Sequence, residues 1–132
     1  MMHNFSVRTV VAVTLMSLLA GCQSAESYRQ AQRADLDQRY PAGSVRKDIH
    51  AKHGEPRRAV VLAEAPDAID VRAQEMLNNM PPETKDLVER YEVYWVSWAH
   101  PAHSSISSRT YADYVFYGNQ DHVISKYRVF VD

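Results

Sequence analysis

The pattern of hydrophobic and polar residues divides the chain into a helical first part and a β-rich second part. The clearest helical period lies between Asp67 and Met80. Apolar residues recur there every three to four positions and share one helix face: Ile69, Ala73, Met76, Leu77 and Met80. Asp67 or Asp70 is the predicted N-terminal cap, and Pro81-Pro82 ends the helix.

A shorter helix is predicted before it, from about Val45 to His53. Ser44 is its predicted cap, because a hydroxyl can accept a hydrogen bond from the amides of the first turn. Gly54 stands where a glycine commonly ends a helix, and Pro56 prevents its continuation.

Two further segments flank the long helix. The apolar run within residues 57–66 is compatible with a short strand or with buried coil. A third short helical segment is predicted from Glu83 to about Arg90, where it would bury Leu87 and Val88.

The remainder reads as β structure. Three runs rich in aromatic and β-branched residues predict strands at Tyr91–Trp98, Tyr111–Tyr117 and His122–Val131. The sequence Gly-Asn-Gln-Asp at 118–121 has the composition of a hairpin turn. We therefore expect an α+β domain in which two to three helices pack on a three-stranded antiparallel meander.

In the last strand, alternation places Val123, Tyr127, Val129 and Val131 toward the core, with Ile124 and Phe130 on the charged face. Aromatic residues occupy both faces of the sheet. This favours a partner-binding patch, because exposed aromatic and arginine side chains are enriched at binding hot spots. The alternative is that helices or the N-terminal segment cover these residues. The candidate patch residues are Tyr94, Trp98, Arg128 and Phe130.

The N-terminus has the features of an export signal. Arg8 precedes an apolar run at 9–20, and Leu19-Ala20-Gly21-Cys22 looks like a bacterial lipobox. We expect residues 1–21 to be a lipoprotein signal peptide. We expect Cys22 to be lipidated, with palmitate among its acyl chains. Residues 22–42 then form the lipidated cysteine and a polar tether, and 43–132 a single α+β domain. Gln23 after the cysteine favours the outer membrane over inner-membrane retention.

Composition and charge exclude several classes of function. The net charge is −1 with interspersed signs, so no nucleic-acid partner is expected. Cys22 is the single cysteine, so no intramolecular disulfide is possible, and once Cys22 is lipidated no cysteine-ligated zinc site and no cysteine nucleophile can exist. There is no Gly-x-Ser-x-Gly elbow and no glycine-rich phosphate loop. We expect no catalytic residues and no cofactor.

Histidines are the remaining candidates for metal chemistry. His50 and His53 lie three residues apart in the first predicted helix, and His100 and His103 lie in a serine-rich loop. Nothing in the sequence completes either pair with further ligands. We therefore predict no metal site, and a histidine-based metal-binding protein stays the weakest alternative.

The segment Gly43 to Pro56, with Gly43, Ile49, Gly54 and Pro56 at its key places, resembles the opening motif of the SmpA/OmlA (BamE-like) lipoprotein family. Tyr114-Val115-Phe116, Gly118-Asn119 and Val123-Ile124 look like the aromatic hairpin of that family. The resemblance implies helices on a three-stranded sheet and a non-enzymatic scaffold or protein-binding role at the inner face of a Gram-negative outer membrane. It also implies a protein partner in the periplasm or outer membrane, such as the β-barrel assembly machinery. The alternative is an inhibitor-like or stress-related envelope lipoprotein with a different partner.

Overall fold

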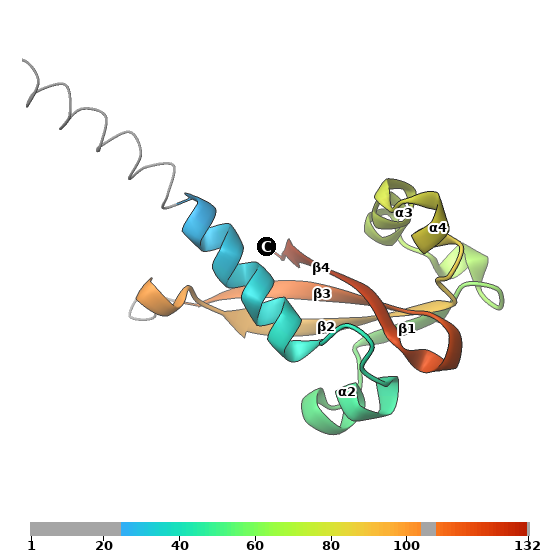
Figure 1. Cartoon of the computed structure of the whole chain (residues 1–132), viewed down its shortest axis with the longest axis horizontal. Coiled ribbons are helices and arrows are strands. Elements are labelled where there is room, and N and C mark those ends of the chain that lie inside the picture. The colour runs from blue at the N-terminus through green and yellow to red at the C-terminus, as the bar shows by residue number, and fades with distance from the viewer. Residues whose placement is uncertain (1–24, 104–107, 132) are drawn as a thin grey trace, which may run out of the picture.

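The computed structural model describes residues 25–103 and 108–131, and within them the central element is an antiparallel sheet. Its four strands lie in the order β1-β2-β3-β4 (Figure 1). They span Arg58–Val61, Arg90–Trp98, Arg109–Tyr117 and Val123–Phe130. The α+β class is confirmed, but the strand number is four instead of three. The fourth strand is β1, because the apolar run after Arg58 pairs with the start of β2.

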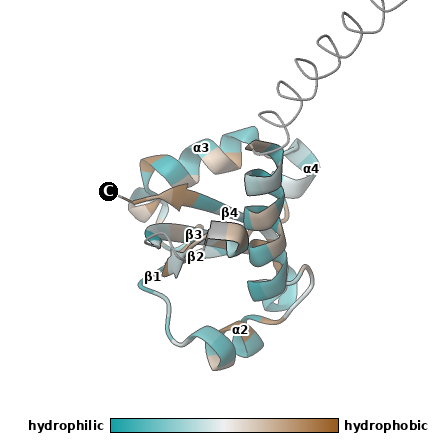
Figure 2. Ribbon diagram, turned by 90° about the vertical axis from the view of Figure 1, so that its left-hand side faces the viewer, coloured by the Kyte–Doolittle hydropathy of each residue, from teal (hydrophilic) through white to brown (hydrophobic). Residues whose placement is uncertain are grey.

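Helices lie on both sides of the sheet (Figure 2). Helix α3 (Val71–Asn79) and the short helix α4 (Pro82–Lys85) follow β1. Helix α2 (Arg46–His53) lies on the opposite side of the strands. None of the helices in the described ranges is long and apolar enough to cross a membrane.

The α3 face carries the larger core. Ala73, Met76 and Leu77 of α3 pack against Tyr91 and Phe116. These sheet residues alternate along their strands, which puts every second side chain on this face. Leu77 is only 2 % exposed, and burying such a side chain contributes about 1.5–3 kcal/mol.

The helix expected from Asp67 to Met80 is divided in two. Pro66–Ala68 forms a single 3-10 turn, and α3 begins only after Asp70. The Asp70 carboxylate accepts a hydrogen bond from the Ala73 amide at 2.7 Å, which confirms Asp70 as the cap. The next helix ends earlier than expected, at Lys85. Val88 is buried as predicted, but Leu87 is 59 % exposed, because the chain has already left the helix there.

Helix α2 also differs at its start. Val45, and not Ser44, occupies the N-cap position, and no side chain caps the helix. The backbone of Val45 instead forms a bridge with His122 at the start of β4. The other end follows the prediction: Gly54 has a φ of 80°, and its amide donates to the His50 carbonyl at 2.8 Å.

A bulge changes the face assignment within β4. The pairing register shifts between Phe116 and Tyr117, so Ile124 is an extra residue in the ladder. Ile124 consequently packs with the α3 core, together with Tyr127, Val129 and Val131. Val123 packs on the opposite face. Val123 is buried as predicted, but the predicted faces of Val123 and Ile124 were wrong, because strict alternation does not allow for a bulge.

The largest difference from expectation is at the N-terminal side of the domain. Residues 25–39, expected within a polar tether, form a helix that crosses the sheet (blue to teal in Figure 1). Leu36 packs with the second core, which contains Tyr40, Ile49, Tyr94 and Val115. This helix and α2 thus cover the face opposite α3. Residues 1–21, expected to be a signal peptide, and Cys22 lie outside the described residues.

Candidate functional site

The predicted partner-binding patch is not an exposed surface. Tyr94 and Trp98 are 4 % and 8 % exposed, and the Arg128 side chain is 2 % exposed. The helix over 25–39 covers this part of the sheet: the ring of Tyr28 meets Trp98 edge-on at 5.4 Å. Only Phe130, at 45 %, is accessible. The four residues share a sheet face as predicted. A helix covers most of that face, however, which is the alternative that we considered together with the patch.

Polar side chains fix that helix to the sheet. Arg128 donates from Nε and Nη2 to the two carboxylate oxygens of Asp113, at 2.7 and 2.9 Å, and contacts Asp35 of the helix at 2.7 Å. The Tyr40 hydroxyl donates to Asp113 at 2.9 Å. Burial by itself lowers the pKa of Arg128, but the hydrogen bonds and charges of Asp113 and Asp35 outweigh it and hold the pKa above its usual value. The role of this cluster is therefore structural.

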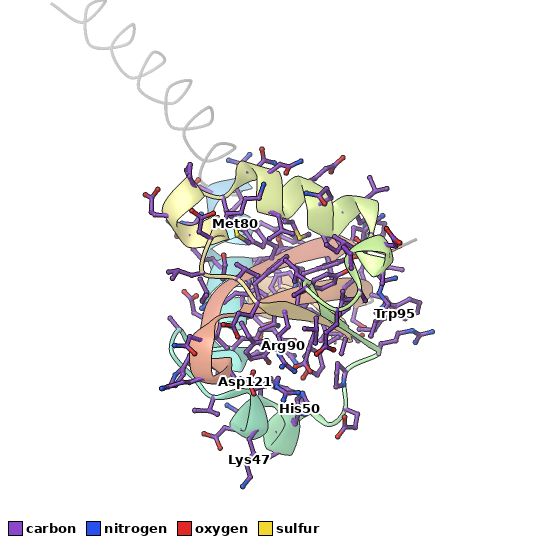
Figure 3. All side chains as sticks on the ribbon, turned by 90° about the vertical axis from the view of Figure 1, so that its right-hand side faces the viewer. Lys47, His50, Met80, Arg90, Trp95 and Asp121 are labelled. Atoms are coloured by element: carbon purple, nitrogen blue, oxygen red, sulfur yellow. The ribbon has the colours of Figure 1, made fainter. Side chains whose placement is uncertain are left out.

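A second buried carboxylate lies under α2. Glu92 is 1 % exposed, and His50 Nε2 lies 2.8 Å from both of its oxygens. Burial and then the charge of Glu92 raise the pKa of the neighbouring Tyr117 and Tyr94 phenols. Arg46 and Arg90 converge on Asp121 at 3.1 and 3.3 Å beside this cluster (Figure 3). A carboxylate so buried and so fully engaged is not accessible to a substrate, so the cluster joins α2 to the sheet.

His50 and His53 each join two parts of the fold. His53 Nε2 lies 2.8 Å from the Arg39 carbonyl oxygen, so this ring links α2 to the end of the preceding helix. His50 is engaged with Glu92. Within the described part of the chain, no three histidine, cysteine, aspartate or glutamate side chains are grouped closely enough to hold a metal ion.

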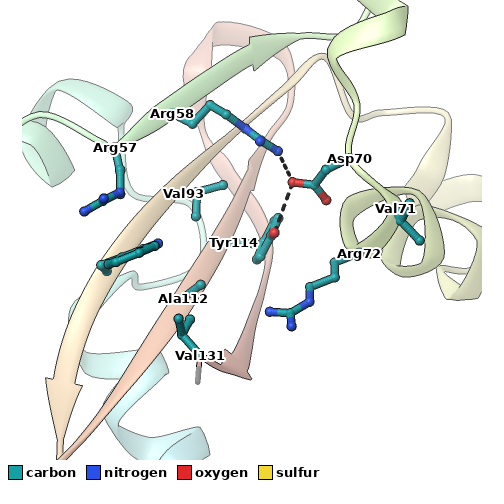
Figure 4. Close-up of a pocket in the computed structure, with 10 residues that line it drawn as sticks. Arg57, Arg58, Asp70, Val71, Arg72, Val93, Ala112, Tyr114 and Val131 are labelled. Atoms are coloured by element: carbon teal, nitrogen blue, oxygen red, sulfur yellow. Dashed lines mark hydrogen bonds and ion pairs between the residues drawn. The ribbon is translucent and has the colours of Figure 1, made fainter.

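An accessible cavity lies on the α3 face, beyond the N-terminal end of α3 (Figure 4). Its volume is about 580 Å³. Its lining includes side chains of the central strands, among them Trp95 of β2, and three arginines. The lining residues that matter for its chemistry are Arg57, Arg58, Asp70, Arg72, Trp95 and Tyr114.

The cavity combines an aromatic ring with cationic groups. The guanidinium carbon of Arg57 lies 3.5 Å from the centre of the Trp95 ring, and Trp95 is 49 % exposed. Arg58 and the Tyr114 hydroxyl both contact the Asp70 carboxylate. Burial and then the charge of Asp70 raise the pKa of Tyr114 to about 12, so the phenol stays a donor at neutral pH. Three guanidinium groups face one carboxylate, which favours an anionic ligand.

One edge of the sheet is open beside this cavity. Strand β1 pairs only with Arg90–Val93, whereas β2 continues to Trp98. On the β1 side, the Val93 carbonyl accepts a hydrogen bond from the Arg57 amide at 2.8 Å. Because backbone direction alternates along an antiparallel strand, the N–H and C=O groups of Trp95 and Ser97 point to the same side. No strand of the described residues pairs with them there.

This site was not predicted from the sequence. Trp95 was assigned to a strand, but the binding surface was expected on the opposite face, and no function was expected for Arg57 or Arg58. The available signal was the arginine pair directly before a short apolar run. Searches for related proteins add no further assignment: no family model, no curated protein and no solved structure matches this chain. The fold and the site define an α+β domain with a cationic and aromatic surface cavity.

Proposed function

We propose that this chain is a non-enzymatic, lipid-anchored protein-binding module of the outer membrane that faces the periplasm and docks its partner at the Arg57–Trp95 cavity. The observation that carries the proposal is that this cavity is open and cationic and lies beside an unpaired strand edge. In contrast, the buried carboxylates Asp113 and Glu92 are fully engaged in joining helices to the sheet.

The family role is part of the proposal. A helix ended by Gly54 and Pro56, followed later by an aromatic antiparallel hairpin, supports an SmpA/OmlA-like scaffold in β-barrel assembly. The fourth strand and the helices on both faces distinguish this domain from the three-stranded arrangement that the resemblance implies.

Photo-cross-linking in intact cells tests the docking site. Benzoylphenylalanine replaces Trp95 in one variant. In a matched control it replaces Leu87, which is exposed but lies outside the cavity. We expect a protein adduct from position 95 that disappears when Arg57→Glu is added, and none from position 87. Mass spectrometry of an adduct with a barrel-assembly component supports the scaffold role, and an adduct with another envelope protein supports the inhibitor-like alternative. Equal adducts from both positions, or none from position 95, would contradict the proposal.

The anchor is tested separately. Cells fed labelled palmitate should incorporate it into the protein and retain the protein in the outer-membrane fraction. Cys22→Ser should abolish both, because no other cysteine is present. Palmitate labelling that survives the substitution would refute lipidation at Cys22.

A further inference from the structure

We infer that the partner segment bound at this cavity is an extended peptide with carboxylate side chains, which adds as a strand to the open edge of β2. This inference rests on the proposed function and names the chemistry of the partner. Addition of a strand supplies affinity through backbone hydrogen bonds, and alternate side chains supply specificity.

The open edge has the length and the orientation that strand addition requires. Beyond the region paired with β1, β2 continues through Tyr94–Trp98. Five residues of strand extend over about 17 Å. The outward backbone groups of Trp95 and Ser97 provide two donors and two acceptors, which is a sufficient ladder for a short peptide.

The side chains next to this edge determine what the peptide must carry. Trp95 and Ser97 point their side chains to the α3 face, as Val93 does one step earlier. Residues of an added strand directly opposite them point to the same face, over the cavity. There they meet Arg57 and, deeper in the cavity, Arg58 and Arg72. A carboxylate at every second position is therefore the complementary pattern.

The same charges disfavour a second copy of the chain as the occupant. Symmetric pairing of two β2 edges would bring two sets of Arg57, Arg58 and Arg72 together, and each copy would add only the carboxylate of Asp70, which its own Arg58 already contacts. A simple anion, such as a phosphate group, satisfies the arginines but leaves the strand edge unused. The edge thus favours a peptide over a small anion.

Anisotropy measurements with designed peptides test the inference on the full chain purified in detergent. The probe is a fluorescein-labelled octapeptide of alternating threonine and glutamate, and the reference peptide has lysine in place of glutamate. We expect only the acidic peptide to bind. Two further versions of the acidic peptide are N-methylated on every second amide, each on a different set. One isomer loses the amides that face β2 and should bind about tenfold more weakly, whereas the other should bind as the parent does.

Two measurements on the protein complete the test. Hydrogen exchange should slow at the Trp95 and Ser97 amides when the acidic peptide binds. The double variant Arg57→Glu, Arg72→Glu should lose the acidic peptide and bind the lysine peptide instead. The matched control Arg29→Glu, Lys47→Glu changes the net charge by the same amount, at exposed positions outside the cavity. It should bind the acidic peptide as the unaltered protein does.

The outcomes separate the two proposals. Equal binding of both N-methylated isomers, or displacement of the peptide by inorganic phosphate alone, overturns strand addition and leaves a simple anion site. No binding of the acidic peptide overturns the inference, while position-95 cross-links in cells would still support the docking function. Peptide binding without any cross-link would contradict the docking function instead.

Discussion

The contact between Arg128 and Asp113 gives the sharpest prediction for stability. Asp113 is fully buried, and both of its oxygens accept hydrogen bonds from the Arg128 guanidinium. In the variant Arg128→Met, an aliphatic side chain remains, but the guanidinium is lost. Asp113 then keeps only the hydroxyl of Tyr40, and Asp35 loses its contact from the sheet.

The expected magnitude follows from the burial of the remaining carboxylate. Removing one partner of a buried ion pair costs about 3–5 kcal/mol, because the other charge stays in the interior without compensation. A domain of this size has a total stability of about 5–15 kcal/mol. At roughly 4–8 °C per kcal/mol, we expect Tm to fall by well over 10 °C.

Urea unfolding followed by circular dichroism measures this loss. The double variant Asp113→Asn, Arg128→Met removes the uncompensated charge and should recover most of the stability lost by Arg128→Met. Lys126→Met, which breaks the more exposed pair with Asp37 on the same strand face, should cost less than about 1 kcal/mol. If Arg128→Met costs no more than Lys126→Met, or the double variant is as unstable as the single one, the cluster does not hold the helix as we argue.

Three further predictions follow from the core and from the tyrosines. Leu77→Ala should cost about 2–5 kcal/mol in urea unfolding, whereas Leu87→Ala, at an exposed site, should change stability by less than about 0.5 kcal/mol. Gly118→Ala should cost about 1–3 kcal/mol by the same measurement, because a Cβ there would overlap the Ile124 side chain. Burial raises the pKa of several tyrosine phenols, and that of Tyr114 reaches about 12. The stability that these protonated phenols contribute is therefore complete below pH 10 and is lost as the pH rises above 10. Phenolate absorbance should therefore appear at higher pH in the folded protein than in the protein unfolded in guanidinium. If the two titration curves coincide, the tyrosines are not buried as described. The raised tyrosines are Tyr40, Tyr94, Tyr111, Tyr114 and Tyr117.

The three long strands were predictable because their signals are local. Aromatic and β-branched residues predominate in each run, and a turn sequence separates the last two. The observed bounds of β2 and β3, Arg90–Trp98 and Arg109–Tyr117, contain the predicted strands and extend them by one or two residues. Strand β1 was harder, because four residues with only one buried side chain become a strand through pairing with β2.

The helix over 25–39 was not predicted as part of the domain, for a physical reason. A hydrophobic period identifies a helix that packs with apolar side chains. This helix packs largely with polar groups: Asp35 contacts Arg128, and the Tyr28 hydroxyl lies 3.0 Å from that of Tyr111. Such contacts leave a polar sequence that resembles a tether.

The cavity depends on sequence-distant contacts. Arg57 meets Trp95 because the register pairs Arg58 with Val93, and no local pattern specifies that register. The face of Trp95 itself was predictable from alternation. Its exposure of 49 % was not, since no local pattern shows how much of the sheet α3 covers.

The packed helix changes what an anchor at Cys22 would do. Between that cysteine and the first described helical residue there are too few residues to reach more than about 10 Å, so a tether long enough to let the domain move freely is not available. Tyr28, one turn into the helix, contacts Trp98 at the end of β2. With the lipid anchor that we propose at Cys22, the open edge at Trp95 and Ser97 would lie near the end of the domain that carries the anchor. A peptide that adds to this edge would then bind close to the bilayer, so our proposal of an anchor at Cys22 favours segments of outer-membrane proteins over proteins free in the periplasm.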